Sequence, residues 1–224
     1  MARARALEVF DLPASQIGRL LDVGCGNGQF IRQMRSLGWD ACGVDPDPAA
    51  VACGLSQGLK VFRGTISDAP VYPGYDVITL NHVIEHVPDP TALLLECKKR
   101  LTPRTGRIMI TTPNLNSLGH RWFGRYWRGL ETPRHLLIFS IPALRNCVSQ
   151  AGLSVNALNT ETRLARMIYS PSAYAKTGET QIGSRTNFRP VTKAAALLFQ
   201  AIEELSILIR KDVGEELFCV CDTQ

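Results

Sequence analysis

Short apolar runs alternate with segments of helical periodicity along most of the 224 residues of the chain. The apolar runs predict buried strands at 19–23, 41–44, 60–63, 76–80, 107–111, 153–159 and 217–221. Helices are predicted between them at 28–37, 48–57, 90–101 and 142–151. This alternation is typical of an α/β fold in which helices cover both faces of a mostly parallel sheet.

A further amphipathic helix is predicted over 191–211. Its apolar positions form one stripe, which comprises Ala195, Leu198, Phe199, Ile202, Leu205 and Ile209. Lys193, Gln200 and Glu203 would lie on the opposite face. We expect the stripe to cover the sheet or a neighbouring insertion. The helix is too short and too charged to span a membrane, which leaves contact with a membrane surface as the alternative.

Two segments, 115–135 and 163–190, fall outside the alternation. The first interleaves aromatic and basic residues, namely Trp122, Phe123, Tyr126 and Trp127 with His120, Arg121, Arg125 and Arg128. The second is rich in Ser, Thr, Gly and Tyr and has little periodicity. Long insertions in a compact domain are usually functional, so we expect one domain over 1–224 with both segments near its substrate. The aromatic residues either stack on that substrate or pack on the domain, and the sequence leaves both open.

Composition adds modest constraints. The formal charge of +5 is ordinary for a mildly basic enzyme and gives little support for a nucleic-acid partner. Seven cysteines show no metal-ligand spacing and lie mostly in apolar stretches. With no signal peptide in front of them, free thiols predict a reduced, cytoplasmic location.

The first predicted strand runs directly into a glycine-rich turn. Gly24, Gly26 and Gly28 occupy every second position, so the backbone can curl tightly and turn its amides toward a ligand. Gln29 stands where a dinucleotide-binding turn would have its third glycine. Asp22 lies just before the turn, where its charge would repel a pyrophosphate and attract a cation.

About twenty residues later, the second predicted strand ends in Asp45, which is suitably placed to bind a ribose diol. A nucleoside that carries a positive charge and lacks phosphates fits both acids. The sequence therefore predicts S-adenosylmethionine as the cofactor and S-adenosylhomocysteine as its product.

These residues resemble a class I S-adenosylmethionine-dependent methyltransferase, and further motifs carry the resemblance over roughly residues 18–160. Residues 75–81 resemble the fourth strand, and 82–90 contain Glu85-His86-Val87-Pro88-Asp89-Pro90, which is close to the E-H-V-x-D-P signature of a subgroup that includes the ubiquinone-biosynthesis O-methyltransferases. Residues 106–114 resemble the fifth strand with its exit loop, and 133–140 resemble a later element. The resemblance implies a Rossmann-like, doubly wound, seven-stranded sheet whose last strand is antiparallel.

The resemblance also implies a set of cofactor-binding residues: Asp22, Gly24, Cys25, Gly26, Gly28, Asp45, Pro46, Thr65, Ile66, Asn81 and His82. In this assignment the glycine turn holds the amino-acid part of the cofactor and Asp45 holds the ribose. Thr65 and Ile66 flank the adenine, and Asn81 and His82 face the methionine part. Asp68 lies a few residues later than the acid that many members use for the adenine amine.

A divalent metal is an alternative that the sequence raises and that we do not favour. His82, Glu85 and His86 are spaced i, i+3 and i+4, so one helical turn would place them on the same face. In the quinone O-methyltransferases, residues of this stretch bind a metal that orients catecholate oxygens. In the metal-free alternative, Glu85 and His86 stabilise the loop by hydrogen bonds.

Methyl transfer needs alignment more than it needs a base, because the methyl carbon is already activated by the sulfonium. A hydroxyl acceptor of high pKa must still lose its proton, and histidine is the usual base near neutral pH. His135 and His86 are the best candidates, and His120 is the third.

The predicted reaction is methyl transfer to a small molecule, with oxygen as the expected acceptor atom. The acceptor would be a quinone precursor, a sugar or another secondary metabolite. The alternatives are a protein or RNA methyltransferase and a catalytically silent cofactor-binding partner protein. The chain could act as a monomer or a homodimer.

Overall fold

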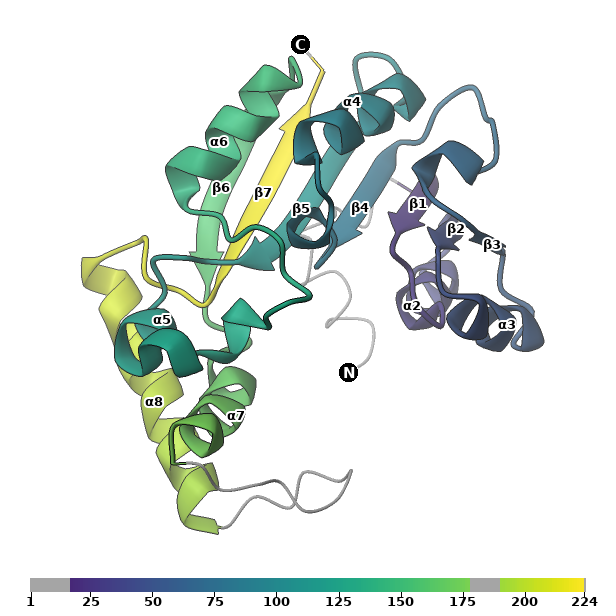
Figure 1. The fold of residues 1–224 in the computed structure, drawn as a ribbon. Helices are drawn as coiled ribbons and strands as arrows, with labels where there is room; N and C mark the ends of the chain where they lie inside the picture. The colour runs from purple at the N-terminus through teal and green to yellow at the C-terminus, as the bar shows by residue number, and fades with distance from the viewer. Residues whose placement is uncertain (1–16, 178–189, 224) are drawn as a thin grey trace.

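The protein is described by a computed structural model that covers residues 17–177 and 190–223. Its strands form one seven-stranded sheet in the order β3-β2-β1-β4-β5-β7-β6 (Figure 1). They are β1 Arg19–Val23, β2 Asp40–Asp45, β3 Val61–Arg63, β4 Val77–Asn81, β5 Arg107–Pro113, β6 Ser154–Glu161 and β7 Glu216–Asp222. β7 is antiparallel to β5 and β6, and the pairs among β1 to β5 are parallel. The predicted doubly wound sheet with an antiparallel last strand is confirmed.

Four helices connect the strands: α2 Gln29–Ser36, α3 Pro48–Ser56, α4 Pro90–Arg100 and α6 Ile141–Gln150. Three of them have an N-terminal capping residue, namely Asp47, Asp89 and Ser140. Each capping side chain accepts a hydrogen bond from a backbone N–H of the first helical turn. The apolar sides of α4 and α6 pack on one face of the sheet. Those of α2 and α3 pack on the other. All four helices were predicted from the sequence.

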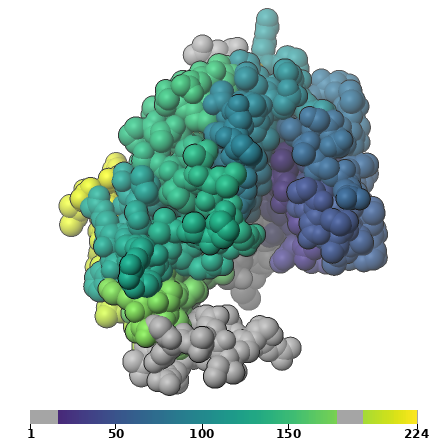
Figure 2. Space-filling view, in the orientation of Figure 1, coloured from purple at the N-terminus to yellow at the C-terminus, as the bar shows by residue number. Residues whose placement is uncertain are grey.

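The order in which strands are added to the sheet reverses between β1 and β4. β2 and β3 lie on one side of β1, and β4 lies on the other. Such a reversal is where open α/β sheets bind their ligands, beyond the carboxyl ends of the strands. Figure 2 shows the surface hollowed between the purple and blue atoms of the N-terminal part, which includes α2 and α3, and the teal and green atoms of the later segments.

The remaining helices gather beyond one end of the sheet as an appendage (Figure 1). They are α5 Leu118–Phe123, α7 Ala165–Thr177 and α8 Pro190–Ile209, with short 3-10 turns η3 Gly124–Tyr126 and η4 Arg128–Leu130 after α5. The appendage has its own apolar cluster of Phe123, Trp127, Ala165, Ile168 and Phe199. Helix α7 shows that the segment predicted at 163–190 contains regular structure, and residues 178–189 of it lie outside the described part.

The predicted orientation of α8 is wrong. Phe199 is buried as expected, but Leu198 is 63% exposed and Leu205 is 65% exposed, whereas the side chain of Glu203 is fully buried. Phe199 sets this rotation, because its ring packs against the rings of Tyr169 and Phe123 at centroid distances of 5.2 and 6.0 Å. Across the described ranges, no helix combines the length and apolar character that a membrane span requires.

Candidate functional site

The glycine turn after β1 is held in a conformation that favours glycine. Gly24, Gly26 and Gly28 have φ values of 70°, 54° and 77°, in the left-handed region. The backbone N–H groups of Gly24 and Cys25 both donate to the carbonyl of Val44 in β2, at 2.8 and 3.1 Å. The turn is therefore tied to the neighbouring strand.

The three glycines differ in what surrounds them. A Cβ at Gly24 would lie 2.5 Å from Val83 Cγ2, and one at Gly28 would lie 2.6 Å from Leu59 Cδ1. A Cβ at Gly26 would meet nothing within 4 Å. The first and last glycines thus allow close packing of the chain on itself, while Gly26 borders open space that a ligand can occupy. This cradle fits the predicted cofactor.

Asp45 lies at the carboxyl end of β2, as predicted, and it joins two backbone segments. Its Oδ2 accepts a hydrogen bond from the Gly26 N–H at 2.7 Å, and its Oδ1 accepts one from the Asp47 N–H at 2.9 Å. Pro46 forms the turn between β2 and the capping residue of α3. Each carboxylate oxygen keeps a second lone pair, so the group can hold the turn and still accept from a diol.

Asp22 is a buried residue of β1, two positions before Gly24, and its side chain reaches β4. Its Oδ1 accepts a hydrogen bond from the Thr79 hydroxyl at 2.7 Å. Burial raises the pKa of Asp22 to about 7, the hydrogen bond from Thr79 opposes this, and the nearby charge of Asp45 adds to it. A cation bound above the turn would favour the ionised form of this carboxyl.

The predicted adenine region lies after β3, where Thr65 precedes a short turn, η1 Ile66–Asp68. The Asp68 carboxylate accepts from the Thr65 N–H at 2.8 Å, so Asp68 caps this turn. Ile66 is buried. Asn81 is the exposed last residue of β4. Thr65, Ile66 and Asn81 all lie at the carboxyl ends of β3 and β4, on the same edge of the sheet as Asp45.

His82 follows β4 with a left-handed φ of 54° and bridges two acids. Its Nε2 lies 2.8 Å from Glu216 Oε1, and its Nδ1 lies 3.2 Å from Glu85 Oε1. Burial alone would lower the pKa of His82, but the hydrogen bonds that it donates to Glu216 and Glu85 outweigh this effect and raise the pKa to about 10. His82 is therefore an imidazolium at neutral pH, with both of its nitrogens in use.

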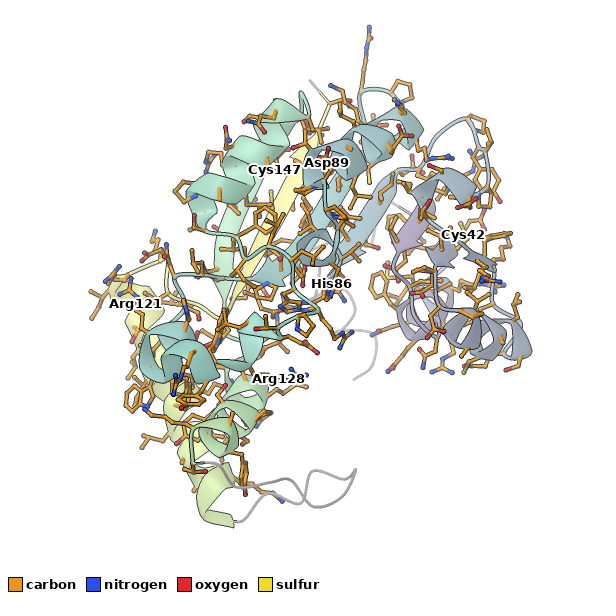
Figure 3. All side chains as sticks on the ribbon, viewed as in Figure 1. Cys42, His86, Asp89, Arg121, Arg128 and Cys147 are labelled. Atoms are coloured by element: carbon orange, nitrogen blue, oxygen red, sulfur yellow. The ribbon has the colours of Figure 1, made fainter. Side chains whose placement is uncertain are left out.

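His86 and His135 face each other at a ring centroid distance of 4.8 Å. His86 Nδ1 lies 2.9 Å from the Arg134 carbonyl, and His135 Nδ1 lies 2.7 Å from the Gly129 carbonyl. A carbonyl can only accept, so the hydrogen of each neutral ring is on Nδ1 and the lone pair is on Nε2. His135 Nε2 is 3.6 Å from Glu131 Oε2. His86 lies at the carboxyl ends of β4 and β5, where Figure 3 labels it.

A different trio from the predicted one could reach a single metal ion. Donor atoms of Glu85, His86 and His135 lie within 4.8 Å of one another. His82 does not belong to this group, because both of its nitrogens face carboxylates. Glu85 is fully buried, and its Oε2 accepts from the Thr112 hydroxyl at 2.9 Å. Each oxygen of this carboxylate thus accepts one hydrogen bond and keeps a second lone pair, so Glu85 retains the capacity to act as a ligand.

His120 and the aromatic residues of the first insertion pack largely on the protein itself. His120 Nδ1 lies 2.6 Å from the Leu115 carbonyl, and its ring stacks against Trp127 at a centroid distance of 5.0 Å. Trp127 is buried and donates its indole N–H to Glu215 Oε2 at 2.7 Å. Trp122 is exposed. Of the two alternatives left open by the sequence, packing holds for Phe123 and Trp127, whereas Tyr126 is half-buried and the exposed Trp122 meets Phe199 edge to face at a centroid distance of 6.1 Å.

Three acids of this region were missed in the sequence. Glu216 pairs with His82, Glu215 binds Trp127, and Glu131 lies beside His135 and accepts from Arg134 Nη1 at 2.5 Å. The adjacent pair Glu215-Glu216 before an apolar final strand was a visible signal, since two acids at a strand start are unusual unless they have partners. The partners of Glu131 are local, since Arg128, Arg134 and His135 lie three or four positions away, and this spacing was the signal that could have found it.

Comparison with known proteins agrees with this geometry. The family model described as "Methyltransferase domain" matches residues 2–158. A ubiquinone biosynthesis O-methyltransferase of Photobacterium profundum is 35% identical over 107 residues, which are 44% of this chain and 45% of that protein. Its namesake from Cereibacter sphaeroides is 30% identical over 162 residues, which are 63% of this chain and 65% of that protein. The match to the first of these relatives thus spans somewhat less than half of its length.

Among solved structures, a S-adenosylmethionine-dependent methyltransferase of Archaeoglobus fulgidus shares the fold. It has a TM-score of 0.60 and 20% identity, and the match covers 98% of this chain and 91% of that one. The family match extends over more than half of the chain and includes the glycine turn, Asp45 and the stretch from His82 to His86. The chain therefore belongs to the family of S-adenosylmethionine-dependent methyltransferases.

Proposed function

We propose that this protein transfers a methyl group from S-adenosylmethionine to an oxygen of a small-molecule acceptor and releases S-adenosylhomocysteine. The observation that carries the proposal is the pair His86 and His135, whose carbonyl-bound Nδ1 atoms leave each Nε2 as a base. Both belong to loops beyond the carboxyl ends of the strands, where Gly26 and Asp45 also lie. Residues 1–224 would act as one methyltransferase domain, with the appendage around α5 and α7 beside the acceptor.

When bound, S-adenosylmethionine supplies an electrophilic methyl group on a sulfonium. In this chain, the turn of Gly24, Cys25, Gly26 and Gly28 would cradle its amino-acid part, and Asp45 with Pro46 would position its ribose. Thr65 and Ile66 would flank the adenine. Asn81 and His82 would border the methionine part.

Negative charge near the cradle supports a cationic cofactor. Asp22 contributes a carboxylate once it ionises. The group of His82, Glu85 and Glu216 combines one imidazolium with two carboxylates and so carries a net negative charge. These groups are buried or partly buried, so their attraction for a cation is less screened than that of surface charges.

The base we propose is His86. Its Nε2 has no partner within hydrogen-bond distance in the described part of the chain, whereas His135 Nε2 is close to Glu131. The acceptor hydroxyl would give its proton to His86 Nε2 as its oxygen becomes the nucleophile. His135 would orient the acceptor, and His120, which packs on Trp127, would have no part in the chemistry.

We favour a mechanism without a metal, because both nitrogens of His82, one of the three predicted ligands, already face carboxylates. The names of the relatives support a quinone precursor as the acceptor, and a sugar or another secondary metabolite is the alternative. Arg128, which Figure 3 labels on the side of α5 toward His86, could bind an anionic group of such a molecule, whereas Arg121 is labelled on the opposite side of α5. The cytoplasmic location that the cysteines suggest stays a prediction, and all seven thiols are free.

Calorimetric titration with S-adenosylmethionine, S-adenosylhomocysteine and NAD tests the cofactor first. We expect micromolar binding of the first two and none of the third; binding of NAD alone would overturn the proposal. Methyl transfer is then measured with labelled cofactor on a phenol, a catechol and a sugar.

His86→Ala should lower kcat by about 100-fold or more on the acceptor that reacts, because one general base contributes a factor of that order. Its cofactor affinity should stay the same. His120→Ala is the matched control and should retain kcat. Activity that disappears with a chelator and returns with a divalent cation would favour the metal alternative at Glu85, His86 and His135.

A further inference from the structure

Helix α8 presents a regular apolar seam to solvent. Its exposed positions include Ala194, Leu198, Ala201, Leu205 and Leu208, which follow one another at intervals of four, three, four and three residues. We call these five residues the α8 seam. Such spacing averages 3.5 residues, so the five side chains form one line along the helix. This pattern is typical of a helix that packs along a second helix. Further exposed apolar residues flank the seam, namely Leu197, Ile202 and Ile209.

The seam is not needed to hold α8 on its own subunit. The opposite face of the helix does that through Ala196 and Phe199, both of which are buried. Of the 17 large hydrophobic side chains exposed in the described residues, six lie on this one helix. Monomeric proteins rarely expose a contiguous apolar patch of more than a few hundred Å², so a partner for this face is expected.

We propose that the partner is a second copy of this chain, whose α8 packs antiparallel on the seam about a two-fold axis at Ala201. In this arrangement Leu198 meets Leu205 of the second copy, and Ala194 meets Leu208 of the second copy. Ala201 meets its own counterpart at the axis. Small residues then lie opposite large ones at the ends, and the small residues at the centre let the helices approach closely.

Charge and shape both favour the antiparallel direction over the parallel one. A parallel pair would place Glu204 beside Glu204 and Lys193 beside Lys193, and it would set Ala194 against Ala194, where a gap would remain. The antiparallel pair separates the two Glu204 side chains across the axis. It brings Lys193 near Arg210 of the second copy at each end, but Arg210 is already paired with Asp212 at 3.2 Å.

The chemistry of the seam favours a protein partner over a membrane. Helices that lie on anionic bilayers carry lysine or arginine along the border of the apolar face, often with tryptophan or phenylalanine within it. Between Lys193 and Arg210, the charged residues of α8 are Glu203 and Glu204, and the exposed face consists of alanine, leucine and isoleucine. Glu204 is exposed beside the seam, where it accepts a hydrogen bond from Gln200 at 2.8 Å.

The area sets the expected affinity. α8 has 20 residues, and two helices of this length packed side by side bury about 600 Å² on each partner, the lower end of the standard range. Interfaces of such size commonly dissociate in the micromolar range. Since Phe199 on the buried face belongs to the cluster with Phe123 and Trp127, the dimer would join the appendages of the two copies.

Sedimentation equilibrium of the full chain tests the proposal. We expect a dimer with micromolar dissociation, and a monomer from Leu198→Glu/Leu205→Glu that keeps its cofactor affinity. Leu55→Glu, at an exposed leucine of α3, is the matched control and should stay dimeric. A wild-type chain that is monomeric at high micromolar concentration overturns the proposal, as does a seam variant that is still dimeric.

Disulfide trapping tests direction and register. Cys53 is the one exposed native cysteine, so the variants carry Cys53→Ser. Ala201→Cys should cross-link to its own counterpart on oxidation. Ala194→Cys should not, whereas Ala194→Cys together with Leu208→Cys should. Cross-linking of Ala194→Cys alone would indicate a parallel pair, and seam-dependent binding of the monomer to phospholipid vesicles would replace the dimer with a membrane contact.

Discussion

His82 Nε2 lies 2.8 Å from Glu216 Oε1, and this contact joins the exit of β4 to the start of β7. The two residues are 134 positions apart in the sequence. The same imidazole binds Glu85, whose backbone carbonyl accepts from the Leu136 N–H at 2.8 Å. One protonated side chain thus links the site's first loop, the last strand and the segment that carries His135.

Replacing Glu216 with Gln should lower the free energy of unfolding by about 1 kcal/mol at pH 7. The loss is small because the His82 side chain is 35% exposed, and a partly solvated ion pair contributes little to the free energy of unfolding. Since the pKa of His82 is raised from 6.5 to about 10, the stabilisation is fully present below pH 6.5 and is lost as the pH rises through about 10. The difference between wild type and variant should therefore shrink in urea unfolding at pH 10.

Asp40→Asn provides the matched control for that experiment. It breaks the pair that Asp40 forms with Lys60 at 2.8 Å, in which both side chains are about half exposed. Exposed pairs contribute close to nothing, so this variant should unfold like the wild type at pH 7. An equal loss in both variants would mean that the bridge from His82 to Glu216 has no special weight.

The sequence predicted the parts of the site that depend on local pattern. The turn from Gly24 to Gly28 follows a strand directly, and Asp45 ends the next one, so both could be placed by counting along the chain. The pair of His86 and His135 could not be placed, because it requires Leu136 to dock on Glu85, a contact across 51 positions. Both histidines were candidates because histidine is the usual base near neutral pH, and this argument did not place them together.

The rotation of α8 also lay beyond the sequence. Periodicity showed an apolar stripe. It did not show that Phe199, at the edge of this stripe, would pack into the cluster with Phe123 and Tyr169. The stripe then faces outward and Glu203 is carried inward. A helix with a broad apolar face can be rotated by a fraction of a turn at little cost, so the neighbouring surface decides the orientation.

Gly26→Ala should weaken cofactor binding, and its cost in stability should be the ordinary cost of an alanine at a left-handed glycine. The added methyl would enter the open space above the turn, so we expect the Kd for S-adenosylmethionine to rise by more than tenfold. The left-handed φ of 54° adds about 1 kcal/mol of backbone strain. Gly58→Ala is the control, because Gly58 has a φ of 70° with nothing within 4 Å of its would-be Cβ and follows α3. Both should lose the same stability in thermal unfolding, and calorimetry should show weakened binding in Gly26→Ala alone.

Cofactor affinity should depend on pH through Asp22. The pKa of Asp22 is raised to about 7 in the free protein, and a bound cation favours the ionised form. Binding should therefore tighten as the pH rises from 6 to about 7 and level off above it, by up to tenfold per pH unit below the pKa. Asp22→Asn should bind more weakly and lack this dependence. Calorimetry measures both proteins with the same ligand, so the ligand's own titration contributes equally to both pH profiles. Parallel profiles would exclude Asp22 as the source of the pH dependence.

Glu203 is a buried acid that should destabilise the fold at neutral pH. Its side chain is fully buried, and neither oxygen has a hydrogen-bond partner in the described residues. Burial, with the nearby carboxylate of Glu215, raises the pKa of Glu203 from 4.5 to about 9. The folded protein thus keeps a proton that the unfolded chain releases, and the penalty grows as the pH rises from 4.5 toward 9. Glu203→Met should raise the free energy of unfolding by about 1–3 kcal/mol at pH 8 and by less at pH 5. Glu204→Met, at the exposed neighbouring position, should change it little at either pH. A destabilised Glu203→Met protein would show that the carboxyl has a partner on this face and that α8 depends on it.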